Sequence, residues 1–191
     1  MKLQEWKKII RVLKIMKMNE RKSKMFDKGI RKINTPIGEF CIISSESGIT
    51  KVTSENYIEN NLTGKKHLDK AEEWIFSYFN GIEIERPCLD YRRMTVFQKK
   101  VLSELVENIS FGETISYGEL AILIENKESM RAIGTALAKN PWPIIIPCHR
   151  VVKKDKTIGK YSVKGGEESK KLLLRHEGTE IFNGKLLINN P

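Results

Sequence analysis

The chain has 191 residues, of which 40% are hydrophobic and 30% are charged, so it is long enough to bury the core of one average domain or two small ones. It contains no run of 18 apolar residues, which excludes a membrane-spanning helix. The formal net charge is +10, but residues 1–32 hold twelve Lys and Arg against three Asp and Glu and therefore carry most of it. The C-terminal half is only mildly basic, so charge alone is weak support for nucleic-acid binding there.

Residues 1–28 are expected to form a basic N-terminal extension. Apolar residues recur near a helical period over residues 3–17, and lysines fill the other face. This pattern is typical of an amphipathic helix that meets anionic lipid or DNA. The alternative is an extension without function, read from a start codon upstream of Met18 or Met25. Lysines interrupt the apolar stretch that a secretory signal requires.

Two kinds of element are expected next. Residues 33–53 have the composition of two or three short strands, with turns at Pro36–Gly38 and Ser45–Gly48. Residues 66–80 then predict a helix that Gly81 closes. The apolar stripe of this helix is Ala71, Trp74, Ile75, Tyr78 and Phe79. The polar, proline-containing segment at 85–94 indicates a link between two domains.

The second half predicts helices. Thr95 is expected to cap a helix that runs to about Asn108. Ser116 is expected to cap residues 117–124 in a capping box with Glu119, and a short turn leads to a third helix over 129–140. Two short helices joined by a tight turn form a helix-turn-helix pattern, which many helical bundles also contain.

The sequence therefore predicts an α+β protein. A small N-terminal α/β domain with a short antiparallel sheet is expected over residues 29–90. A mostly helical C-terminal domain that contains the helix-turn-helix is expected over residues 91–191.

The segment PWPIIIPCHRVV at residues 141–152 carries the candidate chemistry. Its three prolines deny the backbone a regular helix and fix the position of Cys148. A rigid loop that presents a cysteine suits a nucleophile, because the thiolate must be aimed and partly exposed. Neighbouring residues of an extended segment point to opposite sides, so we expect a water to carry the proton between Cys148 and His149. The alternative is a Cys-His pair that merely packs in an apolar loop.

A carboxylate is expected to orient His149, following the logic of nucleophile, base and third group. The candidates downstream are Asp155, Glu167, Glu168, Glu177 and Glu180, and composition does not choose among them. The other two cysteines, Cys41 and Cys88, have no metal-type spacing and are expected to be small buried hydrophobic residues. An odd, low cysteine count favours a reducing compartment, so the cytoplasm is expected.

From Phe97 to Gly178 the sequence resembles the O6-alkylguanine-DNA alkyltransferases, also called methylated-DNA–protein-cysteine methyltransferases. The blocks FQKKVLSEL, FGETISYGELA, RAIG, KNPWPIIIPCHRVV, GKYS and LLLRHEG follow in the order of that family. The resemblance implies single-turnover transfer of an alkyl group from O6-alkylguanine in double-stranded DNA to Cys148. It implies no cofactor, no membrane and a monomer, nucleoid-associated if the source is prokaryotic.

Catalytic roles carry over with the motifs. Cys148 resembles the alkyl acceptor, His149 the base that acts through water, and Glu177 the carboxylate that orients it. Tyr117 resembles the tyrosine that stabilises charge on the guanine as the alkyl group leaves.

The same motifs imply DNA and pocket contacts. Arg131 resembles the arginine that enters the base stack when the nucleotide flips, and Asn140 the asparagine that ties the helix-turn-helix to the active-site loop. Val151 offers backbone to the exocyclic amine of the base, and Tyr161 with Ser162 resembles the loop that covers it. Further residues expected at the DNA face or in the pocket are Ser116, Gly134 and Pro143.

The chain departs from the family pattern in two places. Lys156 stands where the family usually has glycine, and the segment YSVKGGEE is about two residues longer before its glycines. The second departure puts the role of Ser162 in doubt. Some relatives bind zinc in the N-terminal domain, but Cys41 and Cys88 have no evident ligand set, so no metal is expected.

Three other functions remain open. An alkyltransferase-like protein binds damaged DNA without transfer, but it lacks the acceptor that Cys148 would supply. A helix-turn-helix regulator would use Cys148 for packing alone. A thiol hydrolase would turn over repeatedly.

Overall fold

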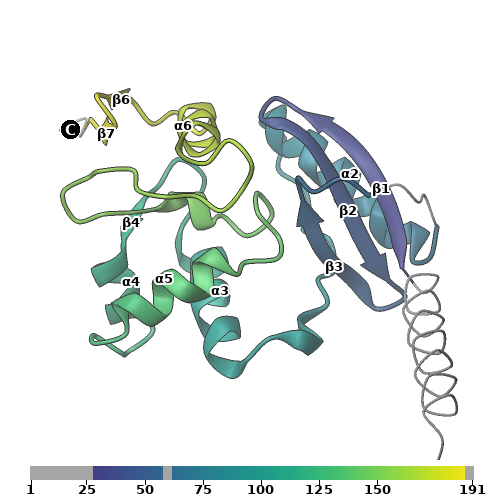
Figure 1. The fold of residues 1–191 in the computed structure, drawn as a ribbon, viewed down its shortest axis with the longest axis horizontal. Coiled ribbons are helices and arrows are strands. Elements are labelled where there is room, and N and C mark those ends of the chain that lie inside the picture. Colours follow the sequence, from purple (N-terminus) through teal and green to yellow (C-terminus); the bar gives the residue numbers. More distant parts are fainter. Residues whose placement is uncertain (1–27, 58–61, 188–191) are drawn as a thin grey trace, which may run out of the picture.

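The computed structural model describes residues 28–57 and 62–187 of the chain. These residues form the predicted α+β arrangement, an antiparallel sheet domain followed by a mostly helical domain (Figure 1). The amphipathic helix predicted over residues 3–17 lies outside the described residues. No helix within the described part is long and apolar enough to cross a membrane.

The N-terminal domain contains three antiparallel strands in the order β1-β2-β3. They are β1 (Gly29–Thr35), β2 (Gly38–Ser45) and β3 (Gly48–Thr53), and both predicted turns are confirmed. The first strand begins at Gly29, before the predicted Ile33. Arg31 and Lys32 are adjacent there and break the alternation of apolar and polar residues, which hid a strand in which buried Ile30 pairs with Ile43.

One helix, α2 (Lys65–Phe79), covers a face of this sheet (Figure 1). It is the helix predicted over 66–80, and Gly81 follows it with a φ of 68°, a left-handed conformation that glycine adopts without strain. Its buried residues are Leu68, Ala71, Ile75 and Tyr78.

The link after α2 is tied to the sheet. The carbonyl of Cys88 accepts from Ile49 N at 2.9 Å, and Asp90 N donates to Ile49 O at 2.9 Å. A single 3₁₀ turn, η1 (Tyr91–Arg93), follows. The Cys88 side chain is exposed, so its predicted burial is wrong, whereas Cys41 is buried as expected. The reason is that the backbone of Cys88 faces β3 and its side chain faces solvent.

The C-terminal domain begins with α3 (Val96–Asn108), α4 (Tyr117–Leu123) and α5 (Met130–Ala138). The predicted caps are confirmed, because Thr95 forms a capping box with Gln98 and Ser116 forms one with Glu119. Helix α6 (Glu167–His176) follows later. Two pairs of short strands complete the domain: the parallel pair β4 (Ile115–Ser116) with β5 (Val151–Val152), and the antiparallel pair β6 (Ile181–Phe182) with β7 (Lys185–Leu186). A 3₁₀ turn, η2 (Cys148–Arg150), leads directly into β5.

The two domains share one continuous hydrophobic core. Trp142 is fully buried between them, and its indole N–H donates to Ile49 O of β3 at 2.8 Å. The edge of β3 also donates from Val52 N to Pro141 O at 2.7 Å. The N-terminal sheet therefore holds the start of the loop that carries Cys148.

Candidate active site

The loop that carries Cys148 is built from buried backbone. Ile144, Ile145 and Ile146 are fully buried, and Ile146 N donates back to Trp142 O at 2.8 Å. Ile144 has a φ of 74°, which is unfavourable for a β-branched residue and costs roughly 1–3 kcal/mol. Burial of all three isoleucines offsets this strain, so the chain reaches Cys148 in one fixed conformation.

Cys148 and His149 lie in the 3₁₀ turn η2 and not in an extended segment. The expectation of an extended backbone is therefore wrong. Pro147 fixes only its own φ, and the next three residues close a tight turn in which Arg150 N donates to Pro147 O at 2.9 Å.

Asn140, just after α5, holds the sulfur of Cys148. Its side-chain amide donates to Cys148 Sγ at 3.1 Å and to Ile146 O at 3.0 Å, and its Oδ1 accepts from Trp142 N at 3.0 Å. The end of the helix-turn-helix is thereby joined to the loop on both sides of the isoleucines.

Cys148 is 8% exposed and lines a cavity of about 290 Å³. This volume is near the lower end of small-ligand pockets, which span about 300–1,000 Å³. The cavity lies between the end of β3, the end of α5 and the segment after Tyr161, with Pro143, Tyr161 and Ser162 in its lining.

The buried pair of His149 and Glu177 lies beside the thiol. His149 Nε2 lies 2.8 Å from Glu177 Oε1, and both side chains are completely shielded from solvent. Of the five candidate carboxylates, the structure selects Glu177. The other ring nitrogen, His149 Nδ1, is buried and has no hydrogen-bond partner among the described residues. It therefore remains available to exchange a proton through a water.

Charge at this pair is set by burial and by Arg150. Burial opposes the negative charge of Glu177, but hydrogen bonds from His149 and from Arg150 outweigh it and lower the pKa of Glu177 to about 2. Burial lowers the pKa of His149. Glu177 raises this pKa, whereas the charges of Arg150 and Lys170 lower it further. The resting site thus contains an ionised carboxylate and a neutral imidazole, which is the form that accepts a proton.

The sequence analysis missed two buried cations of this site. Arg150 donates to Glu177 through Nε at 2.8 Å and to Ile109 O at 2.6 Å. Lys170 of α6 is 1% exposed and donates to Val151 O at 2.6 Å. The spacing of α6 contained a signal, because Lys170 occupies the same helix face as Leu173, Leu174 and Glu177.

The thiol is held neutral at rest. Burial raises the pKa of Cys148, while the hydrogen bond from Asn140 and the charge of Lys170 act in the opposite direction. Burial lowers the pKa of Lys170 to about 8, with Cys148 and Glu167 opposing it. Ionisation of the sulfur consequently requires a proton acceptor.

The residues predicted for DNA contact lie on α4 and α5. Tyr117 is the first residue of α4 and is half-buried, and burial followed by the nearness of Cys148 raises its pKa. Arg131 on α5 is exposed. Ser116 is buried, and its hydroxyl oxygen accepts from Glu119 N, so a DNA contact from Ser116 would have to use the O–H donor.

Of the predicted pocket residues, four line the cavity, namely Asn140, Pro143, Tyr161 and Ser162, and Val151 does not. The hydroxyl of Tyr161 is buried and has no hydrogen-bond partner within the described residues, while Ser162 is exposed. Lys164 N of the same segment donates to Ser54 Oγ of the N-terminal domain at 3.2 Å. Val151 is buried in β5, and its carbonyl retains a second lone pair beside the hydrogen bond from Lys170.

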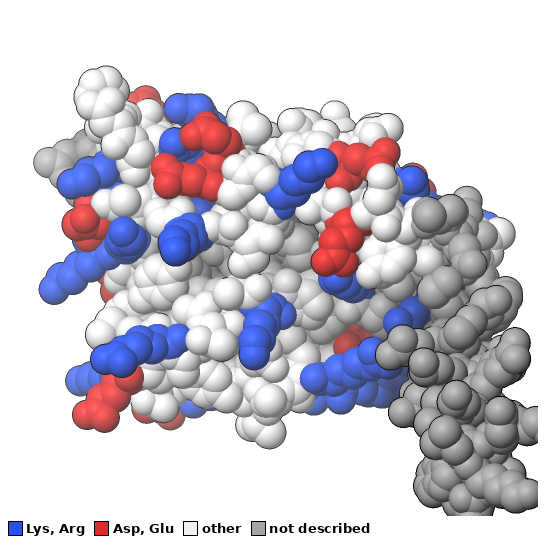
Figure 2. All heavy atoms as spheres, viewed as in Figure 1, with Lys and Arg blue, Asp and Glu red and all other residues white. Residues whose placement is uncertain are grey.

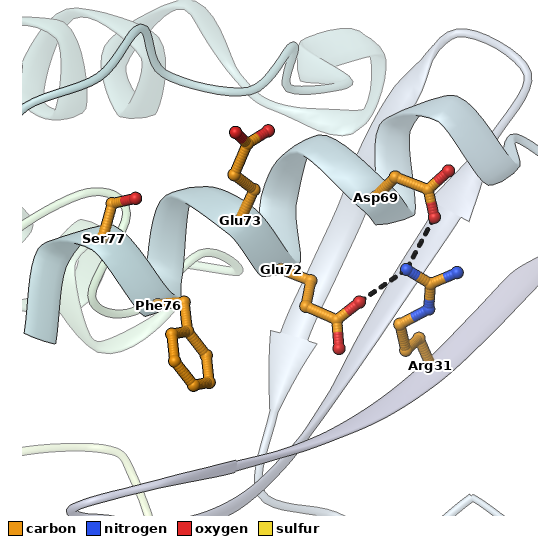
Figure 3. A pocket seen from close by; sticks show the side chains of 6 residues that line it. All are labelled: Arg31, Asp69, Glu72, Glu73, Phe76 and Ser77. Atoms are coloured by element: carbon orange, nitrogen blue, oxygen red, sulfur yellow. Dashed lines mark hydrogen bonds and ion pairs between the residues drawn. The ribbon is translucent and has the colours of Figure 1, made fainter.

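A second cavity, of about 420 Å³, lies between β1 and the outer face of α2 (Figure 3). Arg31 there bridges Asp69 at 2.7 Å and Glu72 at 2.6 Å. Its lining residues contain no nucleophile, and three of its four charged groups already pair with each other, so we assign no chemistry to it. Within residues 28–57 and 62–187, no group of three or more His, Cys, Asp or Glu side chains is arranged to hold a metal ion.

Charged side chains are mixed over the face seen in Figure 2. Lys and Arg lie among Asp and Glu and do not gather into a single patch. This agrees with the mild charge of the C-terminal half.

Two family models match the chain. Residues 96–179 match "6-O-methylguanine DNA methyltransferase, DNA binding domain", and residues 30–85 match "6-O-methylguanine DNA methyltransferase, ribonuclease-like domain". The second match covers the N-terminal sheet and α2, where the sequence alone gave only a loose resemblance.

Proteins similar to this chain carry the same description. A methylated-DNA–protein-cysteine methyltransferase of Mus musculus is 51% identical over 119 residues, which are 58% of this chain and 55% of the relative. The chain thus spans about half the length of that curated relative. A methylated-DNA–protein-cysteine methyltransferase of Haemophilus influenzae is 37% identical over 153 residues, which are 75% of this chain and 82% of the relative.

Solved structures agree with the sequence matches. An O6-methylguanine methyltransferase of Mycobacterium tuberculosis has a TM-score of 0.65 and 32% identity, and the match covers 78% of this chain and 92% of that one. A Mycobacterium tuberculosis structure in complex with DNA matches with the same TM-score and identity, over 78% and 93% of the two chains.

Proposed function

Because the chain belongs to the O6-methylguanine DNA methyltransferase family, we propose that it repairs DNA by moving an alkyl group from O6 of guanine to Cys148 Sγ. The observation that carries the proposal is the setting of this sulfur. It faces a cavity, it accepts a hydrogen bond from Asn140, and the next residue is a buried histidine paired with Glu177.

The proposed reaction is a single displacement. The thiol proton passes through a water to His149 Nδ1. Glu177 stabilises the resulting imidazolium, and Arg150 keeps the carboxylate of Glu177 ionised. A sulfur lone pair forms the S–C bond while the bond between the alkyl carbon and O6 breaks. The electron pair of that bond stays on the guanine, where the Tyr117 hydroxyl donates a hydrogen bond to the developing negative charge. The product is a thioether, which is stable, so each molecule reacts once.

Access to the base requires the nucleotide to leave the duplex, at a cost of roughly a few kcal/mol. We propose that α5 lies in the minor groove and that exposed Arg131 fills the gap left by the flipped nucleotide. Ser116 and Gly134 would lie at the same DNA surface. Replacing Arg131 with alanine should slow repair of duplex DNA more than reaction with a free O6-alkylguanine base, and equal losses on both substrates would contradict the role.

Pocket roles follow for the residues around the cavity. Pro143 and Tyr161 would flank the flipped base and its alkyl group, and Val151 O would accept from the exocyclic amine. Ser162 would cover the base from the longer loop. Asn140 would keep the sulfur and the helix-turn-helix in one fixed geometry.

At the level of the whole chain, the proposal is a monomer acting on double-stranded DNA in the cytoplasm. Its sheet domain would end near residue 90, and its DNA-binding and active-site domain would begin at residue 91. The hydrogen bonds between the link and β3 support a boundary just after Asp90.

The decisive test is mass spectrometry after incubation with duplex DNA that contains one O6-methylguanine. We expect a single added methyl group on the peptide that contains Cys148, with one lesion lost for each protein molecule. The Cys148→Ala variant is the control, and it should bind DNA and transfer nothing. Repeated turnover would indicate a thiol hydrolase, and binding without transfer would indicate a damage-binding protein or a regulator. Either result would reject the proposal.

A further inference from the structure

The catalytic carboxylate receives a hydrogen bond from the other domain. Tyr78 lies near the end of α2, and its hydroxyl donates to Glu177 Oε1 at 2.7 Å. The same oxygen lies 2.8 Å from His149 Nε2 and accepts from Arg150 at 3.0 Å. One oxygen atom thus joins the N-terminal helix to the base of the proposed reaction.

The position of the Tyr78 hydroxyl is fixed. The residue is 6% exposed, and its ring stacks on Trp74 at 5.7 Å and meets Phe111 edge-on at 5.8 Å. Its carbonyl accepts from the ring of His176 at 2.9 Å, and His176 directly precedes Glu177. The tyrosine is therefore clamped at both its backbone and its ring, and its hydroxyl has little freedom to leave the carboxylate.

We propose that Tyr78 is a positioning residue for alkyl transfer, whose hydroxyl holds Glu177 in place and thereby sets the orientation and proton affinity of His149. The proposal rests on the proposed function, in which His149 takes the thiol proton. It gives the N-terminal domain a direct part in the active site.

The physical basis is the sharing of one carboxylate among several donors. A carboxylate that accepts fewer hydrogen bonds is more basic and binds an imidazolium more tightly. Besides Glu177, the charged groups that act on His149 are Arg150 and Lys170, which oppose its protonation, and the ring of Tyr161 lies edge-on to it at 6.4 Å. Burial, followed by the charge of Glu177, raises the pKa of Tyr78 well above its usual value, so its hydroxyl stays a donor at every working pH.

The test compares Tyr78→Phe with the wild-type chain by NMR titration of the His149 ring, whose signal a His149→Gln variant identifies. Loss of the hydroxyl should raise the pH at which His149 protonates by roughly half a unit to one unit, since one charge-assisted hydrogen bond is lost. Below that pH, methyl transfer should be about three- to tenfold slower, because a shift of one unit is a factor of ten. Affinity for duplex DNA should not change.

Tyr91→Phe is the matched control, because Tyr91 is half-buried against Trp142 and its hydroxyl takes no part in the contacts of Glu177 described above. It should behave as wild type. If the pH at which His149 protonates is the same in Tyr78→Phe and in wild type, the proposal is overturned, whether or not the reaction is slower. A purely structural role of Tyr78 would slow the reaction without changing that pH. The titration needs no substrate, so it measures the effect of Tyr78 on His149 even if the wild-type protein takes up no methyl group. That failure would refute the proposed function and not the effect of Tyr78.

Discussion

At the scale of single residues, the reactive sulfur is governed by opposing influences. Burial keeps Cys148 protonated, while the Asn140 hydrogen bond and the charge of Lys170 favour the thiolate. Because the thiolate is the form that oxidises and alkylates, a resting thiol is protected from stray reagents. Under the proposed function the protein reacts once and is consumed, so it would benefit from this protection until the lesion is bound.

Removing the charge of Lys170 should make the thiol harder to ionise. In Lys170→Met the side chain keeps its length and its place among the leucines of α6, but Cys148 loses a nearby cation and Val151 O loses its donor. We expect the rate of reaction with a small thiol reagent to reach its plateau at higher pH. Lesion transfer at neutral pH should fall by about tenfold, the factor that follows from a shift of one pKa unit. Lys170→Arg keeps the charge and should lie closer to wild type, and identical pH profiles for both variants would exclude the electrostatic role.

Lys156 has a backbone conformation that lowers the stability of the fold. Its φ is 64°, in the left-handed region that glycine adopts easily and other residues do not. Lys156→Gly should therefore stabilise the fold by about 0.5–1 kcal/mol, because relief of strain exceeds the added chain entropy. Urea unfolding at neutral pH measures this change. Lys154→Gly, at an exposed position without a positive φ, is the control, and a loss of stability in both variants would contradict the strain argument.

At the scale of elements, α5 combines a buried face with a surface of small residues. A Cβ added to Gly134 would meet just one atom within 4 Å outside the helix backbone, Tyr117 Cε1 at an ordinary 3.9 Å. The fold therefore does not demand a glycine in the middle of this helix, where it costs about 1 kcal/mol relative to alanine. The proposed close approach of α5 to DNA would account for this glycine.

The Gly134→Ala variant should accordingly change stability and binding in opposite directions. We expect the free energy of unfolding to rise by about 0.5–1 kcal/mol, since alanine is the better helix former. Affinity for duplex DNA should fall at the same time, because the added methyl group would separate α5 from the minor groove. Thermal unfolding and fluorescence anisotropy with a labelled duplex provide the two measurements. Ser77→Ala on α2 is the control, because it changes helix propensity in the other domain and leaves α5 unaltered. A Gly134→Ala variant that binds DNA as wild type does would exclude Gly134 from the interface.

An interaction could be predicted from the sequence when its two residues lie close together along the chain. The cap at Thr95 and the capping box of Ser116 with Glu119 were predicted because the interacting groups lie within three residues of each other. The choice of Glu177 among five carboxylates came from family resemblance, since it lies 28 residues from His149. Periodicity assigned Tyr78 to the core stripe of α2, and it does pack there, but its hydroxyl reaches a carboxylate 99 residues away, which no local pattern contains.

At the scale of the whole molecule, the cluster around Glu177 joins both domains. The carboxylate binds Tyr78 from α2 and Arg150 and His149 from the active-site loop, with its own side chain shielded from solvent. Arg150 extends the network to the end of α3 through Ile109 O. The active site is thus also a structural junction, and its ionisation should affect the stability of the whole fold.

Acid should weaken this junction in a defined range. The pKa of Glu177 is about 2 in the folded protein against 4.5 for an ordinary glutamate, so its contribution is complete above about pH 5 and is lost as the pH falls toward 2. This difference corresponds to roughly 3 kcal/mol of unfolding free energy. Urea unfolding at pH 7, 5, 4 and 3 measures the slope.

Glu177→Gln keeps the shape of the side chain and removes its titration. At pH 7 the variant should be less stable by roughly 3–5 kcal/mol, because Arg150 remains buried without its counter-ion. Between pH 5 and pH 3 it should lose less stability than wild type, since the group that titrates there is gone. Glu55→Gln is the control, because exposed Glu55 pairs with Lys51 on the surface and has little effect on stability. Parallel slopes for wild type and Glu177→Gln would show that other carboxylates cause the acid sensitivity.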